Sequence, residues 1–180
     1  MASKPAFAVW ITGLPASGKS TIAHALKKQL EARGIDAAVL ESDELRRILT
    51  PHPTYDPEER ERFYRAMIHT GRMLVKHGIP VIFDATANRR VWREQARREI
   101  PRFIEIYAEC PLEVCMARDP KGIYRRGRES GGTVPGLHEP YEAPENPEVV
   151  IPCEHGDPEE AAAHIIFRLI EAGFVPCERG

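Results

Sequence analysis

The sequence lacks the patterns that mark several broad classes of protein. Its four cysteines form no C-x-x-C pair and give no recognisable zinc-site pattern with histidine. The net charge is only −2, which gives no bulk reason to expect nucleic acid or a membrane as a partner. No apolar run approaches the roughly eighteen residues needed to span a bilayer, and residues 1–5 show no signal-peptide pattern. We therefore expect a cytoplasmic protein that binds neither nucleic acid nor a membrane.

The chain of 180 residues is long enough for one domain, residues 1–180, with a substantial core. Apolar runs alternate with helical patterns, which predicts an α/β fold with a parallel sheet flanked by helices. Five strands are expected, at about 6–12, 37–40, 79–84, 103–107 and 149–151. Helices are expected at about 18–33, 45–49, 57–76 and 89–98, from Pro111 onward, and at about 158–172.

Over residues 119–148, which we call the lid segment, the periodic pattern gives way to glycine, proline and charge. Such a long irregular stretch in a compact domain is typical of a lid or a binding loop. Cations cluster at its start: Arg118, Lys121, Arg125, Arg126 and Arg128. We expect this cluster to close over the phosphates of a nucleotide, and a merely solvated loop is the alternative. His138 is the one histidine that falls in this expected active-site loop.

The stretch from Gly13 to Thr21 reads G-L-P-A-S-G-K-S-T and lies between an apolar run and a helical pattern. This is the G-x-x-x-x-G-K-S pattern in the strand–loop–helix context that gives it meaning. The glycines let backbone N–H groups point at phosphate oxygens, and the helix adds its positive end. We expect a nucleoside triphosphate on Gly13, Pro15, Ala16, Ser17, Gly18, Lys19, Ser20 and Thr21. The alternative is a glycine turn with an incidental lysine.

Within this P-loop, Lys19 can reach the β- and γ-phosphates and Ser20 offers a hydroxyl to Mg²⁺. A P-loop alone is compatible with a motor, a GTPase or a kinase. The sequence shows no N-K-x-D guanine signature and is too short for an added motor domain. Compact size, a second acidic strand end and an arginine-rich lid segment favour a small-molecule kinase, which acts by positioning and charge stabilisation.

Two aspartates follow predicted strands at the edge where open α/β sheets bind ligands. Asp43 is expected to act as a base or orienter for the acceptor hydroxyl, with an N-cap of the next helix as the alternative. Asp84 has the form of a Walker B carboxylate and is expected to hold Mg²⁺ together with Ser20. A strand-end turn is its alternative, and the sequence leaves open whether it serves metal or substrate. Lys19, Asp43 and Asp84 are thus the candidate catalytic residues.

Arginines recur on the helices that begin at the same edge, namely Arg46, Arg60, Arg65, Arg90 and Arg93. Most of them should be solvated or paired in salt bridges. One or two should meet an anionic acceptor, because the guanidinium fork matches the geometry of phosphate and sulfate.

The segments C-M-A-R-D-P-K-G-I-Y at 115–124 and P-Y-E-A-P-E at 140–145 are similar to the adenylylsulfate (APS) kinase family. The P-loop and the pair Asp43-x-x-Arg46 fit the same family, and the match runs in order over nearly the whole chain. The resemblance implies a P-loop NTPase fold, use of ATP and Mg²⁺, a homodimer, and phosphoryl transfer to the 3′-hydroxyl of adenosine 5′-phosphosulfate. It also implies that Asp43 lies near that hydroxyl and that Arg46 and Arg60 bind the acceptor. Arg118 would flank the ATP adenine and Lys121 would lie near the phosphates.

Departures from the family pattern gather on the acceptor side. Phe63 stands where the family has asparagine, Ala87 where it has serine, and Val134 where an aromatic ring stacks on the substrate adenine. The candidate substrate-binding residues on this side are Asp43, Arg46, Arg60, Phe63, Arg65 and Arg90. Losing the stacking ring, or the family's lysine that Gly132 replaces, costs on the order of 1–3 kcal/mol of binding each, enough to redirect specificity. Two alternatives stay open: a kinase for another nucleotide-linked or phosphorylated molecule, and a non-catalytic nucleotide-binding regulatory module.

Overall fold

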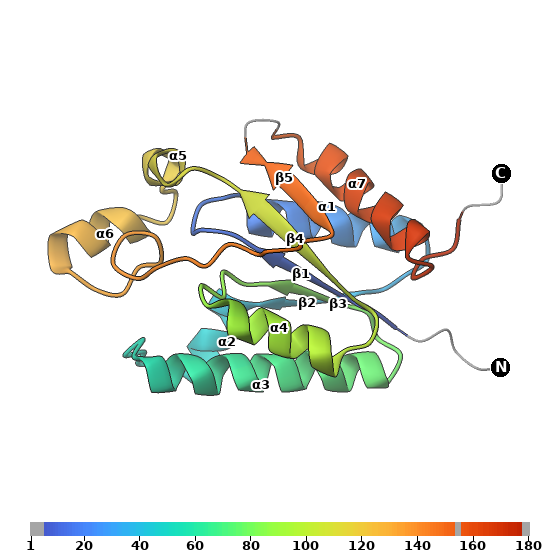
Figure 1. The fold of residues 1–180 in the computed structure, drawn as a ribbon, viewed down its shortest axis with the longest axis horizontal. Helices are drawn as coiled ribbons and strands as arrows, with labels where there is room; N and C mark the ends of the chain where they lie inside the picture. Colours follow the sequence, from blue (N-terminus) through green and yellow to red (C-terminus); the bar gives the residue numbers. More distant parts are fainter. Residues whose placement is uncertain (1–5, 154–155, 178–180) are drawn as a thin grey trace.

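The computed structural model describes residues 6–153 and 156–177 as one sheet with helices on both faces (Figure 1). The strands are β1 (Ala8–Thr12), β2 (Ala38–Glu41), β3 (Val81–Asp84), β4 (Phe103–Glu109) and β5 (Val149–Pro152). They lie in the order β2-β3-β1-β4-β5, and every neighbouring pair is parallel. The predicted five-stranded parallel sheet is confirmed. Residues 1–5, where the sequence shows no signal-peptide pattern, lie outside the described residues.

The helices are α1 (Lys19–Ala32), α2 (Ser42–Leu49), α3 (Pro57–Lys76), α4 (Arg90–Glu99), α5 (Leu112–Arg118), α6 (Ile123–Ser130) and α7 (Pro158–Glu171). Figure 1 shows α1 and α7 over one face of the sheet and α3 and α4 over the other. Since all the strands run the same way, their carboxyl ends share one edge, toward α5 and α6. Among the described residues, none of the helices is both long and apolar enough to cross a membrane.

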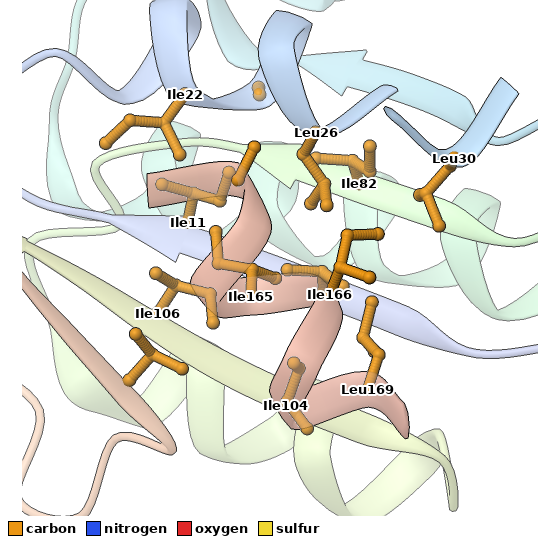
Figure 2. Packing of buried hydrophobic residues seen from close by; sticks show 14 of the residues in the cluster. Ile11, Ile22, Leu26, Leu30, Ile82, Ile104, Ile106, Ile165, Ile166 and Leu169 are labelled. Atoms are coloured by element: carbon orange, nitrogen blue, oxygen red, sulfur yellow. The ribbon is translucent and has the colours of Figure 1, made fainter. Parts of the chain in front are cut away.

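Apolar residues fill the space on each side of the sheet. Figure 2 shows Leu26 of α1 and Ile165 of α7 meeting Ile11 of β1 within the cluster on one face. Trp10 and Phe83 stack on the opposite face with ring centroids 4.6 Å apart, under α3 and α4. The strands β1 and β3 are buried along their whole length, because helices cover them on both faces. The central strands are therefore a rigid base for the loops that follow them.

Helix boundaries follow the capping residues that the sequence contains. The side chain of Asp56 accepts a hydrogen bond from the Glu59 amide at the start of α3, and Asp157 does the same for Glu159 at the start of α7. Proline occupies the first turn in both helices, where its missing N–H costs nothing. Gly34 follows α1 in the left-handed region, at φ +71°, as the predicted helix stop requires.

The lid segment is not wholly irregular, because α6 lies inside it, and the prediction of a continuous loop is wrong there. The carboxylate of Asp119 accepts hydrogen bonds from the amides of Tyr124 (3.2 Å) and Arg125 (2.9 Å), so it supplies partners that a helix start needs. Gly122 enters the helix at φ +65°. Buried Tyr124 and Gly127 then dock the helix on the domain. Beyond α6 the segment is irregular apart from one bridge between Pro135 and Glu139.

Candidate active site

The P-loop connects β1 to α1 at the centre of the sheet's carboxyl edge. A Cβ on Gly13 would lie 2.5 Å from the carbonyl oxygen of Ala108, so only glycine fits there. Gly18 caps α1 in the left-handed region at φ +97°. The hydroxyl of Ser17 is buried and has no hydrogen-bond partner among the described residues. An unpaired hydroxyl beside the N-terminus of a helix is the chemistry of an anion site.

Lys19, the first residue of α1, is buried against the P-loop with 8% of its surface exposed. Its Nζ donates a hydrogen bond to the carbonyl of Leu14 at 2.9 Å. Burial lowers the pKa of Lys19, whereas the nearby carboxylates of Asp84 and Asp43 favour its charged form. The ammonium group of Lys19 thus lies inside the loop, bound to its backbone.

A cleft of about 410 Å³ opens beside the P-loop. Its walls come from the P-loop and the start of α1, from the junction of β2 with α2, from the end of β3, and from the start of the lid segment. The lining residues are Pro15, Ala16, Gly18, Lys19, Ser20, Thr21, Glu41, Ser42, Asp43, Asp84, Thr86, Arg118, Asp119, Pro120, Lys121 and Ile123. The structure therefore brings the three candidate catalytic residues together with both lid cations assigned to the nucleotide. Two of the predicted nucleotide-binding residues, Gly13 and Ser17, are not among these lining residues.

Asp43 lies in the first turn of α2, whose N-cap residue is Glu41. The alternative that Asp43 caps this helix is therefore wrong. Its Oδ2 accepts from Nζ of Lys121 at 2.6 Å, and both side chains are more than half exposed to the cleft. The hydrogen bond to Asp43 raises the pKa of Lys121. The lid segment thus places a cation directly on the predicted base.

Asp84 is the last residue of β3 and lies in register with Ile11 of the P-loop strand, as predicted. Its carboxylate lines the cleft although only 5% of the residue is exposed. Within the described chain it forms no hydrogen bond and no salt bridge with another side chain. A buried, unpaired carboxylate facing Lys19 and Ser20 across a cleft is a ready ligand for a cation.

The lid segment is closed against the P-loop. The hydroxyl of Tyr124 donates to the carbonyl of Pro15 at 2.9 Å. A Cβ on Gly136 would lie 2.7 Å from a methyl group of Leu14, so the two loops are in tight contact. His138 supports this arrangement locally, because its Nδ1 accepts a hydrogen bond from the amide of Val134 at 3.3 Å.

The predicted cluster of lid cations is only partly brought into the cleft. Arg118 and Lys121 line it, whereas Arg125, Arg126 and Arg128 are exposed on α6 and do not. The reason is the helix itself, which turns its buried face, Tyr124 and Gly127, toward the domain and its arginines outward. The expectation that all five cations cover the phosphates is therefore wrong for the three on α6.

A second cavity of about 220 Å³ adjoins the other side of the P-loop. It shares Gly18, Thr21 and Arg118 with the cleft and is otherwise lined by Ser17, Ile22, Ile151, Pro152, Cys153, Gly156, Asp157, Pro158 and Ala161. Arg118 is fixed between the two spaces by a hydrogen bond to the carbonyl of Cys153 at 3.1 Å. The cavity is more apolar than polar and lies next to the phosphate loop, which suits a purine ring.

The two arginines that the resemblance assigns to the acceptor are held by other residues of the chain. Arg46 forms a salt bridge with Glu59 at 3.0 Å, and its guanidinium lies 3.9 Å from the ring centre of Phe63. Arg60 donates from Nε to the carbonyl of Tyr55 (2.9 Å), from Nη1 to Asn88 Oδ1 (3.0 Å) and from Nη2 to the carbonyl of Thr133. All three groups of the Arg60 fork are engaged, and the residue is 7% exposed.

The other predicted acceptor residues differ in their surroundings. Phe63 is 2% exposed within the apolar core under α3, where it supports Arg46. Arg90 forms a salt bridge with Glu145 of the lid segment. Arg65 is exposed on α3 and lines neither the cleft nor the cavity that adjoins it.

Sequence reasoning left two neighbours of the site unassigned. Thr86, two residues after Asp84, lines the cleft. Tyr55 is 39% exposed, takes a positive φ of 57°, and lies 5.0 Å from the guanidinium of Arg46 and 5.7 Å from that of Arg60. It lines a third cavity, of about 230 Å³, with Arg60 and Asn88. The resemblance offered one signal for Tyr55, because there it takes the place of a phenylalanine of the family and so keeps an aromatic ring.

Comparison with known proteins agrees with this geometry. The model of the adenylylsulphate kinase family matches residues 5–152. The probable adenylyl-sulfate kinase of Archaeoglobus fulgidus is 45% identical over 154 residues, which cover 84% of this chain and 98% of that protein. The adenylyl-sulfate kinase of Picosynechococcus is 37% identical over 169 residues, which cover 93% of this chain and 95% of that protein.

Among solved structures, the Mycobacterium tuberculosis APS kinase CysC in complex with AMPPNP and APS is similar with a TM-score of 0.85. It is 32% identical, and the match covers 92% of this chain and 98% of that one. These matches confirm the family resemblance that the motifs indicated.

Proposed function

This chain belongs to the adenylylsulphate kinase family, and we propose that it transfers the γ-phosphate of ATP to the 3′-hydroxyl of adenosine 5′-phosphosulfate. One observation carries the proposal. Lys19 at the start of α1, Asp43 in the first turn of α2 and Asp84 at the end of β3 line one cleft at the P-loop. Such an arrangement suits an ATP-dependent phosphotransferase with an alcohol as acceptor, because positioning and charge supply most of the catalysis.

In this proposal ATP lies across the P-loop. Its phosphates occupy the cleft against the loop amides and Lys19. Its adenine occupies the adjoining cavity, with the planar guanidinium of Arg118 at the boundary between the two. The closed contact between Tyr124 and Pro15 keeps water from this side.

Magnesium fits the same cleft. Ser20 offers a hydroxyl and Asp84 a buried carboxylate without a salt bridge to any described residue, and oxygen donors of this kind are the ligands that Mg²⁺ prefers. Bound to the phosphates there, the ion would offset their negative charge. We propose Ser20 and Asp84 as its protein ligands.

The acceptor hydroxyl is placed between Asp43 and the γ-phosphate. In the transfer step its oxygen forms the new bond to phosphorus, its proton passes to the Asp43 carboxylate, and ADP leaves with the former bridging oxygen. In the structure, Nζ of Lys121 donates a hydrogen bond to Oδ2 of Asp43 at 2.6 Å. On substrate binding Lys121 can turn from Asp43 to the phosphates, since both side chains lie in the open cleft.

The remainder of the acceptor is directed toward Tyr55, Arg46 and Arg60. An exposed ring flanked by two guanidinium groups suits a purine joined to an anionic phosphosulfate. Tyr55 then supplies stacking area that the change to Val134 removes from the lid segment. We further propose that the protein is a cytoplasmic homodimer, and light scattering of the purified chain measures the dimer directly.

A coupled assay that measures ADP release tests the activity. The expected result is turnover with APS that exceeds turnover with other nucleotides and phosphorylated metabolites. Turnover confined to another acceptor would refute APS as the substrate. If no acceptor is phosphorylated although ATP binds, the chain is a regulatory nucleotide-binding module.

A further inference from the structure

Buried side chains of β1 and α4 donate hydrogen bonds to the backbone that follows Asp84. The carbonyl of Ala85 accepts from Trp10 Nε1 at 3.1 Å, and the carbonyl of Thr86 accepts from Thr12 Oγ1 at 2.6 Å. The carbonyl of Ala87 accepts from Arg93 Nη1 at 3.0 Å. Ala87 itself takes a positive φ of 41°, which is strained for a residue with a Cβ. Side chains therefore hold a segment that would otherwise relax.

One hydroxyl lies at the centre of these contacts. Thr12, the last residue of β1, precedes the P-loop directly and is fully buried. Its Oγ1 donates its single hydrogen to the Thr86 carbonyl, so it must accept from Arg93 Nη1 at 3.1 Å and from the Tyr141 hydroxyl at 3.0 Å. Tyr141 is thus fixed as a donor, and burial raises the pKa of its phenol further from physiological pH.

Arg93 also links the Thr12 hydroxyl to the C-terminal part of the lid segment. Its side chain is fully buried, and its Nη2 donates to the carbonyl of Glu142. Nε lies 2.9 Å from the carboxylate of Glu105 on β4, which balances the charge. The Glu142 amide in turn donates to the carbonyl of Asn88 at 2.8 Å. A buried charge in this setting is costly unless every contact is kept, so the geometry is sharply defined.

We propose that Arg93 and Tyr141 are positioning residues that act through Thr12 to fix the Thr86–Ala87 backbone against the P-loop. Neither residue lines the cleft. They hold the strand end that carries Asp84 and the cleft residue Thr86 at a set distance from the phosphate loop. Their effect on turnover rests on the proposed kinase activity, because this distance sets where the proposed metal ligand Asp84 lies relative to the phosphates.

The chain offers a matched pair of variants. Tyr141→Phe removes only the hydroxyl that donates to Thr12. Tyr107→Phe is the control. The Tyr107 ring stacks on Tyr141 with centroids 6.1 Å apart, and its hydroxyl has no hydrogen-bond partner among the described residues. We expect Tyr141→Phe to lower kcat roughly tenfold, since small misplacements near the chemistry are costly. Its KM for ATP and its ATP-binding stoichiometry should stay unchanged, and Tyr107→Phe should match the original chain.

A merely structural role predicts a different result. In that case kcat would fall only in proportion to the fraction of molecules that bind ATP, which calorimetric titration measures. That outcome, or equal kcat in the two variants, overturns the proposal. Thr12→Ser keeps the hydroxyl and should retain most of the kcat, whereas Thr12→Val should lose at least as much as Tyr141→Phe.

A second measurement is independent of the acceptor. Amide hydrogen exchange of a peptide that covers residues 85–88, in the chain bound to a non-hydrolysable ATP analogue, reports directly on this backbone. Exchange should be several-fold faster in Tyr141→Phe and unchanged in Tyr107→Phe. Equal exchange in both variants refutes the positioning role even if APS proves not to be the substrate. Conversely, faster exchange without APS turnover refutes the proposed acceptor alone.

Discussion

The ATP side and the acceptor side of this cleft are built by different means. The ATP side is a contiguous stretch of backbone, Gly13–Thr21, in which glycine geometry and a helix start create the phosphate site. The acceptor side is assembled from side chains of α2, α3 and the lid segment, and its arginines are already engaged by carboxylates and carbonyls. A backbone site keeps its specificity as long as its glycines remain. A side-chain site can change its preference with a few substitutions.

The largest expected effect breaks the ATP side. Lys19→Ala removes the lysine buried in the P-loop, and turnover should fall by about 10³-fold or more, because Lys19 is the cation that the loop itself fixes at the phosphates. ADP release in the coupled assay measures this. Lys27→Ala, on the exposed part of α1, is the control and should keep full activity. Undiminished transfer by the Lys19 variant would refute the P-loop assignment.

The next effect separates the two sides at the reacting centre. Asp43→Asn removes the proton acceptor but keeps the shape, so kcat should fall on the order of 10²-fold or more while ATP affinity stays nearly unchanged. Calorimetry and initial rates measure the two quantities. Asp84→Asn should instead weaken the dependence of the rate on Mg²⁺ concentration. If Asp84→Asn slows transfer far more than Asp43→Asn at saturating Mg²⁺, the two roles must be exchanged.

A smaller effect should appear on the acceptor side alone. Tyr55→Ala should raise KM for APS roughly tenfold, since stacking of one base is worth about 1–3 kcal/mol. Tyr55→Phe keeps the ring and should restore most of the affinity. KM for ATP should not change in either variant. Equal KM for APS in the two variants would show that the ring is not the platform for the acceptor.

The sequence predicts the structure of the ATP side better than that of the lid segment. The P-loop, Asp84 beside it and the five parallel strands follow from local patterns, and the structure agrees. Helix α6 was missed because it has no apolar stripe and buries only Tyr124 and Gly127. Its start depends on Asp119, which is recognisable as a cap only once the turn at Gly122 is known.

The buried arginines show a second limit of sequence reasoning. Arginine on a helix is usually solvated, so a pattern of charges gave no reason to separate Arg93 from Arg65. The structure buries the side chain of the first beside Glu105 and leaves the second exposed. The partners of Arg60, namely Asn88 and Thr133, are 28 and 73 residues away in the chain. Contacts at such separations leave no trace in local periodicity.

The smallest expected effect tests whether the two sides are energetically independent. Asp56 and Asp157 are matched N-caps, each followed by proline in the first turn of its helix. Asp56 starts α3 beside Tyr55, whereas Asp157 lines the cavity proposed for the ATP adenine. Replacing either by alanine should lower Tm by about 2–4 °C, since each removes one capping hydrogen bond. Asp56→Ala should then raise KM for APS about twofold to threefold, because a looser helix start frees Glu59 and hence Arg46. Asp157→Ala should raise KM for ATP by a similar factor. If each variant changes both KM values equally, the two sides are energetically coupled through the sheet. The ATP side and the acceptor side would then differ in how they are built but not in how they respond to substitution.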